Sequence, residues 1–261
     1  MNLLVCFKIY SDLTKVKLED LEIDEEMGVD THFLPNIINC FDESSLEFAI
    51  RLSENYTSIN KSALTICKSA ANMTLKSLLA LGYENVVRIE ADEMQIRFNP
   101  ETVAENIVKY VKKNNQDLIL IGKESPLSNN AATAQLVSNK LNYPLISSVI
   151  DIKVIDDNII NVKIENNNSI YSQNIKLPCV LSMGNAVISK LRMPTLKERM
   201  KNKNRKIEEV DFVESEKTIF NQPISIYKPK RNRQGIIYKI DGDENITAIL
   251  DKELSKRIIE L

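Results

Sequence analysis

The stretch "NPETVAENIVKYVKKNNQDLILIG", residues 99–122, decides the fold class. Its first part predicts a helix over 99–113, because Asn99 can cap it, Pro100 suits the first turn and Ala104, Val108 and Val111 share one face. Its second part, residues 117–122, is an apolar run that ends in a glycine. Such runs are typical of parallel strands that helices cover on both faces. A helix followed at once by such a strand indicates an α/β fold.

The same alternation extends through the first half of the chain. Further strands are expected over 3–9, 63–67 and 85–89, and further helices over 43–55, 72–82 and 132–141. We therefore predict a doubly wound, mostly parallel, Rossmann-like sheet over residues 1 to about 150. Sheets of this kind bind ligands outside the carboxyl ends of their strands. The segments expected at that rim are 6–12, 67–71 and 122–133, with 39–43 at a further position.

The pattern changes near residue 147. Residues 147–183 alternate apolar and polar side chains and predict antiparallel strands and hairpins. A short helix is expected over 195–203, an extended segment over 205–212, and an amphipathic helix over 244–259. We predict an α/β nucleotide-binding domain over 1–210 and a C-terminal arm over 211–261. The apolar face of the last helix suits docking on another chain and packing on its own domain equally well.

Composition excludes several classes of function. The chain has 261 residues, 43% of them hydrophobic, and a net charge of −2, without the basic face that nucleic-acid binding requires. Four cysteines with no CxxC pair and a single histidine argue against a zinc site, a disulfide framework and a histidine triad. No segment has the length and apolarity of a membrane span, and the first residues do not resemble a signal peptide. We expect a cytoplasmic protein.

The strongest local signal is "IGKESPLSNNAATAQ", residues 121–135. The chain has no GxGxxG motif and no P-loop. Here a buried strand ends at Gly122, and a polar loop leads into a helix that starts with the small residues Ala132 and Thr133. Small residues let a phosphate approach the backbone N–H groups of a helix N-terminus. A plain helix capped by Asn129 or Asn130 is the alternative, and both interpretations stay open.

A second signal is "NCFDESSLEFAIRL", residues 39–52. Asp42 stands where an N-cap is expected, Glu43 suits the positive end of the helix dipole, and the ring of Phe41 lies beside the helix N-terminus. A capped surface helix and a nucleotide or flavin site both fit this arrangement. Cys67 ends a strand at the predicted rim, and we interpret it as a packing residue beside a ligand, not as a nucleophile. No pair of carboxylates is visibly set for acid–base chemistry.

Taken together, these segments resemble the beta subunit of electron transfer flavoprotein over residues 3 to 210. The resemblance rests on "LLVCFKIYSD" (3–12), "INCFDESSLEFAIRL" (38–52), "LLALGYENVVRI" (78–89), "DLILIGKES" (117–125), "TAQLVSNKLNYP" (133–144), "LPCVLSM" (177–183) and "LRMPTLKERMKNKNRKIE" (191–208). Each motif is modest, and their shared order and spacing make the match specific. It implies a fold like that of the adenine nucleotide alpha hydrolases.

The resemblance also implies a function. Such subunits are not catalytic: they pair with an alpha subunit that holds most of a redox-active FAD, carry electrons from dehydrogenases such as an acyl-CoA dehydrogenase, and bind a structural AMP. The positions that match the family's cofactor site, with Phe41 near the flavin, are Cys6, Asn39, Cys40, Phe41, Asp42, Cys67, Gly122, Lys123, Asn129, Asn130, Ala131, Ala132, Thr133 and Gln135. The positions that match its partner-recognition loop, within 184–196, are Val187, Ile188, Leu191, Arg192 and Pro194. The C-terminal arm would embrace the alpha subunit.

Three alternatives remain open at this stage. Thr133-Ala134-Gln135 resembles the electron-bifurcating members of the family, which use NADH and bind a second FAD in place of AMP. A stand-alone adenine-nucleotide hydrolase or transferase would need a lysine by the phosphates, for which Lys8, Lys68 and Lys123 are the candidates. A scaffold that has lost its nucleotide would fit the low glycine count and the departures from the family pattern, such as Cys40 in place of a proline.

Overall fold

The computed structural model describes residues 1–17, 20–23, 28–31, 33–126 and 129–214, and the single positions 225, 247, 248, 250, 251 and 255. The chain divides into two units, Met1–Ile226 and Tyr227–Leu261. Every helix and strand named below lies in the first unit. Of the helix expected over 244–259, the described residues are helical, and the rest lies outside the described residues. The predicted boundary between 210 and 211 stays a prediction.

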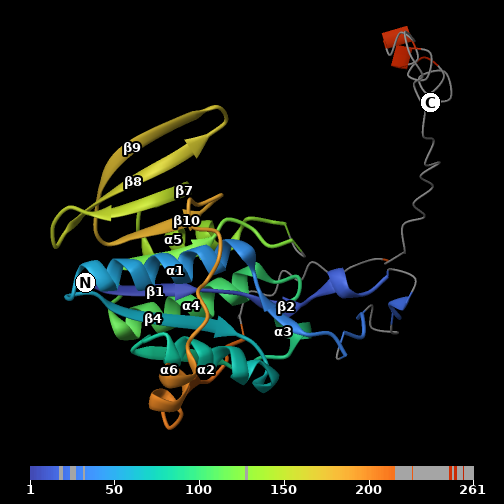
Figure 1. Ribbon diagram of the computed structural model, residues 1–261, viewed down its shortest axis with the longest axis horizontal. Helices are drawn as coiled ribbons and strands as arrows, with labels where there is room; N and C mark the ends of the chain where they lie inside the picture. Colours follow the sequence, from blue (N-terminus) through green and yellow to red (C-terminus); the bar gives the residue numbers. More distant parts are fainter. Residues whose placement is uncertain are drawn as a thin grey trace. The chain divides into compact units, whose positions relative to one another are not determined.

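A sheet of nine strands forms the centre of the first unit, in the order β11-β5-β4-β1-β6-β10-β7-β8-β9 (Figure 1). The strands are β1 (Asn2–Cys6), β4 (Asn60–Ile66), β5 (Asn85–Ile89), β6 (Leu118–Gly122), β7 (Leu145–Val154), β8 (Ile159–Asn166), β9 (Ser169–Lys176), β10 (Cys179–Met183) and β11 (Glu208–Val210). All pairings from β11 to β7 are parallel, and only β8 and β9 run antiparallel to their neighbours. The predicted fold class is confirmed.

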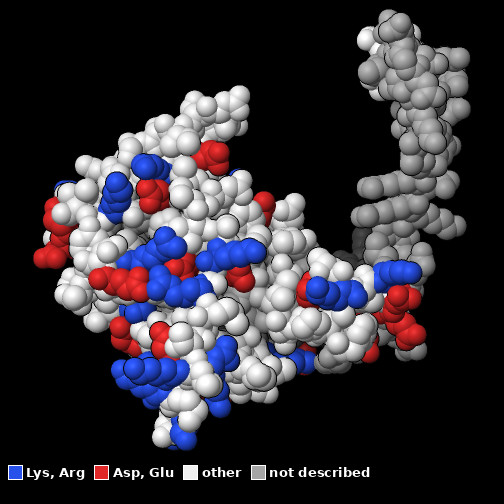
Figure 2. Space-filling model, in the orientation of Figure 1, with Lys and Arg blue, Asp and Glu red and all other residues white. Residues whose placement is uncertain are grey.

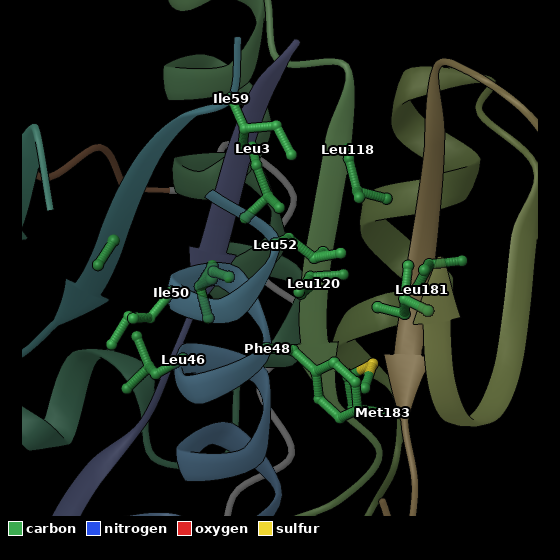
Figure 3. Packing of buried hydrophobic residues seen from close by; sticks show 14 of the residues in the cluster. Leu3, Leu46, Phe48, Ile50, Leu52, Ile59, Leu118, Leu120, Leu181 and Met183 are labelled. Atoms are coloured by element: carbon green, nitrogen blue, oxygen red, sulfur yellow. The ribbon is translucent and has the colours of Figure 1, made fainter. Parts of the chain in front are cut away.

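Helices cover both faces of this sheet. The helices are α1 (Cys40–Asn55), α2 (Asn72–Ala80), α3 (Glu93–Ile96), α4 (Pro100–Asn114), α5 (Thr133–Leu141) and α6 (Leu196–Asn202). The buried residues of α1 and α2 form one hydrophobic cluster with the sheet, and those of α4 and α5 form a second. In the first cluster, Phe48 and Leu52 of α1 point onto β6 and β10 near Leu120 and Met183 (Figure 3). Burial of such side chains contributes about 1.5–3 kcal/mol each.

The strand order places a topological switch point between β1 and β6. Cys6 of β1 lies in register with Leu64 of β4 on one side and Ile121 of β6 on the other. The chain leaves β1 toward the face that α1 covers, and it leaves β6 toward the face that α5 covers. The two connections therefore diverge at the carboxyl ends of these strands, where doubly wound folds bind ligands.

The structure corrects three local expectations. β10 was expected in an antiparallel hairpin and is parallel to β6 and β7. All five residues of β10 are buried, as expected of a strand that is covered on both faces. The alternation of apolar and polar residues before β10 therefore does not extend into it. Helix α1 begins three residues earlier than expected. The short antiparallel pair β2 (Ile9–Ser11) and β3 (Asn36–Ile38) was not predicted.

A 3₁₀ turn, η1 (Leu13–Lys15), follows β2, and a second, η3 (Ser69–Ala71), precedes α2. The peptide bond between Leu177 and Pro178 is cis. No helix among the described residues has both the length and the apolarity that crossing a bilayer demands.

Candidate functional site

The first turn of α1 is tied to the ends of β1 and β6 through one carboxylate. Asp42 is buried, and it accepts hydrogen bonds from the backbone N–H groups of Lys8 and Gly122, both at 2.8 Å. It was expected to cap α1, but it lies inside the helix, and the N-cap position belongs to Asn39. The donors that Asp42 satisfies belong to neighbouring strands, so its role is to join three elements at the switch point.

The surroundings of Asp42 raise the pKa of its carboxyl group. Burial raises the pKa of this carboxyl to about 6, against the opposing effect of its hydrogen bonds from Lys8, Asn39 and Gly122. The buried side chain of Asn39 donates to Asp42 at 3.1 Å and to the backbone carbonyl of Glu124 at 2.9 Å. Asn39 and Asp42 together fix the start of the loop that follows β6.

Gly122 is required at this junction by close packing. A Cβ at this position would lie 2.2 Å from Asp42 Oδ1, 3.0 Å from the Cβ of Phe41 and 3.1 Å from Asn39 Nδ2. Real Cβ atoms do not approach other heavy atoms so closely. The glycine that ends β6 therefore allows the first turn of α1 to sit against the strand.

The end of the loop offers backbone donors. Asn129 and Ala131 have positive φ angles of 45° and 50°, whereas Ala132 has φ −91° and ψ −30°. When neighbouring residues alternate between left-handed and right-handed backbone conformations, their N–H groups point to the same side. N–H groups arranged in this way form a concave site that binds anions. The first N–H groups of α5, from Thr133 onward, add donors that have no acceptor within the helix. Asn130 accepts a hydrogen bond from the N–H of Ala132 at 3.3 Å, and Gln135 is exposed.

These donors suit the phosphate of a nucleotide. The positive end of the α5 dipole favours an anion, and the side chains of Ala131 and Ala132 are too small to block its approach. The donor set therefore fits a mononucleotide or a dinucleotide whose phosphate lies at the start of α5. The chain contributes backbone groups here, and no side chain of the loop is needed to hold the charge.

The two predicted rim cysteines lie at the ends of neighbouring strands. Cys6 ends β1 and is buried, and burial raises the pKa of its thiol far above the usual range. Cys67 follows β4 and is half-buried, and burial raises the pKa of its thiol to about 11. Both thiols are therefore protonated at neutral pH, which favours packing roles over nucleophilic ones. Cys40 is exposed in the first turn of α1. The amine of Lys68 forms an ion pair with Asp92 at 3.1 Å.

Phe41 lies beside a polar cavity. A hollow of about 300 Å³ is lined by Phe41, Lys123, Glu124, Ser148, Glu165, Asn167, Gly184 and Asn185. These residues come from α1, from the loop after β6, from β7, from β8 and the turn that follows it, and from the segment after β10. Of the residues that line it, Phe41 and Lys123 were predicted for the cofactor site, Glu124 lies in the predicted nucleotide loop, and Gly184 and Asn185 lie in the predicted recognition segment. The others come from parts of the chain far apart, and only the fold brings them together.

The predicted partner-recognition positions divide into two groups. Val187 is 76% exposed, whereas Ile188 and Leu191 pack against the core cluster beneath α1, and Pro194 is buried. The guanidinium of Arg192 contacts two carboxylates of α1, from Glu47 and Glu54. Sequence reasoning did not single out Glu47, because a glutamate in an amphipathic helix is ordinarily exposed. In the sequence, the apolar residues Phe48 and Ala49 that follow Glu47 are the signal that could have indicated its burial.

Comparison with known proteins places the chain in a family. The model of the "Electron transfer flavoprotein domain" matches residues 26–215. The chain is 26% identical over 233 residues to the electron transfer flavoprotein subunit beta of Dictyostelium discoideum, covering 87% of this chain and 89% of that protein. It is 25% identical over 277 residues to the subunit beta of Megasphaera elsdenii (100% and 99%), and 25% identical over 235 residues to that of Homo sapiens (89% and 90%).

The matched region covers well over half of the chain, and the doubly wound sheet with its switch-point site is the fold that the resemblance implied. The chain therefore belongs to the electron transfer flavoprotein family. The similarity to proteins named as its beta subunits extends over most of the length of each, and the resemblance stated from the sequence is confirmed. Membership makes the chain part of a flavoprotein system of electron transport.

Proposed function

We propose that the chain is the beta subunit of a heterodimeric electron transfer flavoprotein in the cytoplasm. Its partner is an alpha subunit that holds most of an FAD, and together they carry electrons from dehydrogenases, such as an acyl-CoA dehydrogenase, to an acceptor. The FAD supplies the redox chemistry when bound, and this chain binds, orients and shields it. The ring of Phe41 and the cavity beside it form the surface that we assign to the flavin.

The observation that carries this proposal is the junction at the switch point. Asp42 and Asn39 hold the loop after β6 at Gly122 and Glu124, and that loop leads to the backbone donors at the start of α5. In our proposal a structural AMP lies there, with its phosphate on the N–H groups of Ala131 and Thr133, since that of Ala132 donates to Asn130, and with Cys6 and Cys67 as packing neighbours. The nucleotide then stabilises the loop on which the flavin-facing cavity depends.

A second FAD in place of AMP is the alternative, in an electron-bifurcating member that uses NADH. The feature that favours it is Thr133-Ala134-Gln135 at the start of α5. The experiment that separates the two is mass spectrometry of the small molecules released from the denatured heterodimer, after co-expression with an alpha subunit. One AMP and one FAD per heterodimer would support the simple carrier. Two FAD and no AMP would support bifurcation, and no nucleotide with no co-purifying subunit would contradict both.

A variant can test the position of the phosphate. Ala132→Asp places a carboxylate at the N-cap of α5, where aspartate favours the helix and repels a phosphate. We expect the nucleotide content to fall to less than about a tenth of the wild-type value, since one charge pair near a partly buried site changes affinity by more than tenfold. Asn139→Asp adds the same charge to the exposed face near the other end of α5 and serves as the control. Equal retention of nucleotide by both variants would place the phosphate elsewhere.

A further inference from the structure

The segment between β10 and α6, residues 184–195, lies across α1. Figure 1 shows this segment passing over α1 on its way to α6. It contains neither helix nor strand, and its backbone is bonded to β7 only at its start, where Gly184 donates to the carbonyl of Val149 and Val187 to that of Ile150. It presents apolar side chains to the outside, because Val187 is 76% and Met193 78% exposed, and Leu196 at the start of α6 is 76% exposed. Beyond Val187, contacts with side chains of other elements must hold the segment in place.

Glu47 of α1 provides one such attachment. It is only 2% exposed, and its carboxylate accepts a hydrogen bond from the backbone N–H of Arg192 at 3.1 Å. The same carboxylate accepts from the guanidinium of Arg192, from Nε at 3.0 Å and from a terminal nitrogen at 2.7 Å. Both the backbone and the side chain of one residue of the segment are therefore bound to one buried group.

Neighbouring carboxylates extend this attachment along α1. Glu43, Glu47 and Glu54 lie on one face of the helix, because they are spaced by four and seven residues. Glu54 also accepts hydrogen bonds from the guanidinium of Arg192. In the same orientation as Figure 1, Figure 2 shows basic and acidic side chains in contact over the middle of this face.

The burial of Glu47 distinguishes this cluster from ordinary surface ion pairs. Exposed pairs contribute little, because water competes for both charges. A buried carboxylate is unfavourable unless it is fully paired, so removal of its partner leaves a strongly unfavourable charge. Arg192 forms the fork geometry that suits a carboxylate. The energetic cost of separating the two residues keeps the segment on α1.

We propose that Glu47 and Arg192 are positioning residues that hold residues 187–196 in the conformation that docks a redox partner. The partner is a dehydrogenase with an apolar patch that receives Val187, Met193 and Leu196. Prior ordering of the segment lowers the entropic cost of association. This inference rests on the proposed function as an electron carrier. Arg192 is assigned to the inside of the docking segment, where it faces α1 and shapes the surface without contacting the partner.

Arg192→Gln in the co-expressed heterodimer tests the proposal, with Arg51→Gln as the matched control. Arg51 donates to the same carboxylate of Glu47 at 2.9 Å, but it lies in α1 and, within the part of the chain that the structure describes, has no hydrogen bond or ion pair to the segment. Hydrogen exchange is measured over 187–196, and electron transfer is measured from an acyl-CoA dehydrogenase reduced by its acyl-CoA substrate. We expect faster exchange in the segment and a KM for the carrier raised about tenfold, with kcat and nucleotide content unchanged, since loss of uniform binding raises KM alone.

Arg192→Lys should restore only part of the affinity, because an ammonium keeps the charge and loses the fork. Unchanged exchange in Arg192→Gln would overturn the attachment. Faster exchange with an unchanged KM would overturn its role in docking, and the same rise in KM in Arg51→Gln would show a general effect of charge. If the wild-type heterodimer accepts no electrons from any dehydrogenase, the proposed function fails, and the exchange measurement alone then decides whether Arg192 holds the segment.

Discussion

At the scale of single residues, Gly122 and Asp42 form the tightest junction of the site. Gly122→Ala places a methyl group against Asp42 Oδ1, with no flexible far end of a side chain to give way, since both oxygens of Asp42 are already bound. We expect the variant to lose about 1–3 kcal/mol of unfolding free energy, the usual cost of overpacking. Chemical denaturation of the heterodimer with matched nucleotide content measures this loss.

The same assay can test whether the methyl group added by Gly122→Ala meets the side chain of Asp42. An Asp42→Ala background removes the closest clash and leaves the contacts with Phe41 Cβ and Asn39 Nδ2. Gly122→Ala should therefore cost less there than in the wild type, by a coupling of about 1 kcal/mol or more. Additive effects of the two substitutions would show that the methyl group meets something other than Asp42. The single variant Asp42→Ala also measures how far the junction depends on this carboxylate.

The same residues show why the site could be predicted only in part. Gly122 and the small residues of 131–133 follow from local sequence, because a strand end and a helix start are local patterns. The role of Asp42 does not, since its donors belong to residues 34 and 80 positions away. Aspartate near a helix start is ordinarily a cap, and here long-range hydrogen bonds recruit it instead. The family resemblance placed Asn39 and Asp42 near the nucleotide, and no pattern in the chain did so alone.

At the scale of elements, the parallel strands and the helices between them were predictable, because apolar runs and helical spacing are strong signals. β5 begins and ends at the predicted residues, and α4 is capped by Asn99, which accepts a hydrogen bond from Thr102. β10 was misassigned because alternation in the preceding hairpins was extended into a run that is buried on both faces. β2 and β3 have three residues each, which is too short for a periodic signal.

The strand β11 at the edge of the sheet is attached by side chains as well as by its pairing with β5. The buried Asn106 of α4 donates to the carbonyl of Val213 at 2.8 Å and accepts from its N–H at 2.9 Å. Arg88 of β5 forms an ion pair with Glu209 at 2.8 Å. The bonds of Asn106 therefore hold the chain just after β11, at the place where the predicted arm begins.

We expect Asn106→Ala to leave the N–H and the carbonyl of Val213 without their partner and to destabilise the attachment by about 1–3 kcal/mol. Hydrogen exchange over 208–213 should accelerate while exchange in β1 and β6 stays slow, because the change is local. Asn114→Ala is the control: Asn114 makes the same type of hydrogen bond within α4, to the carbonyl of Tyr110, and among the described residues its side chain has no hydrogen bond to β11 or to Val213. Equal acceleration in the two variants would contradict the assignment.

At the scale of the whole molecule, the arm and the α/β domain are expected to divide stability and partner binding between them. The sequence predicts an arm from residue 211, and the structure ties the chain to the domain as far as Val213. A chain that ends at Glu214 keeps these bonds, the pairing of β11 and the bonds of Arg205 to the carbonyls of Tyr83 and Glu84. A chain that ends at Asn204 loses all of them.

We therefore expect the truncation after Glu214 to unfold within a few degrees of the full chain, and the truncation after Asn204 to unfold at a markedly lower temperature. The loss of several part-buried polar contacts and of one strand corresponds to a few kcal/mol, and each kcal/mol shifts Tm by about 2–4 °C in a domain of this size. Both truncations should co-purify with the alpha subunit much less than the full chain does, because the predicted arm embraces that subunit. Scanning calorimetry and pull-down from co-expressing cells measure the two properties separately. Full retention of the alpha subunit by the chain ending at Glu214 would assign partner binding to the α/β domain alone, and the apolar face of the last helix would then be expected to pack on its own chain.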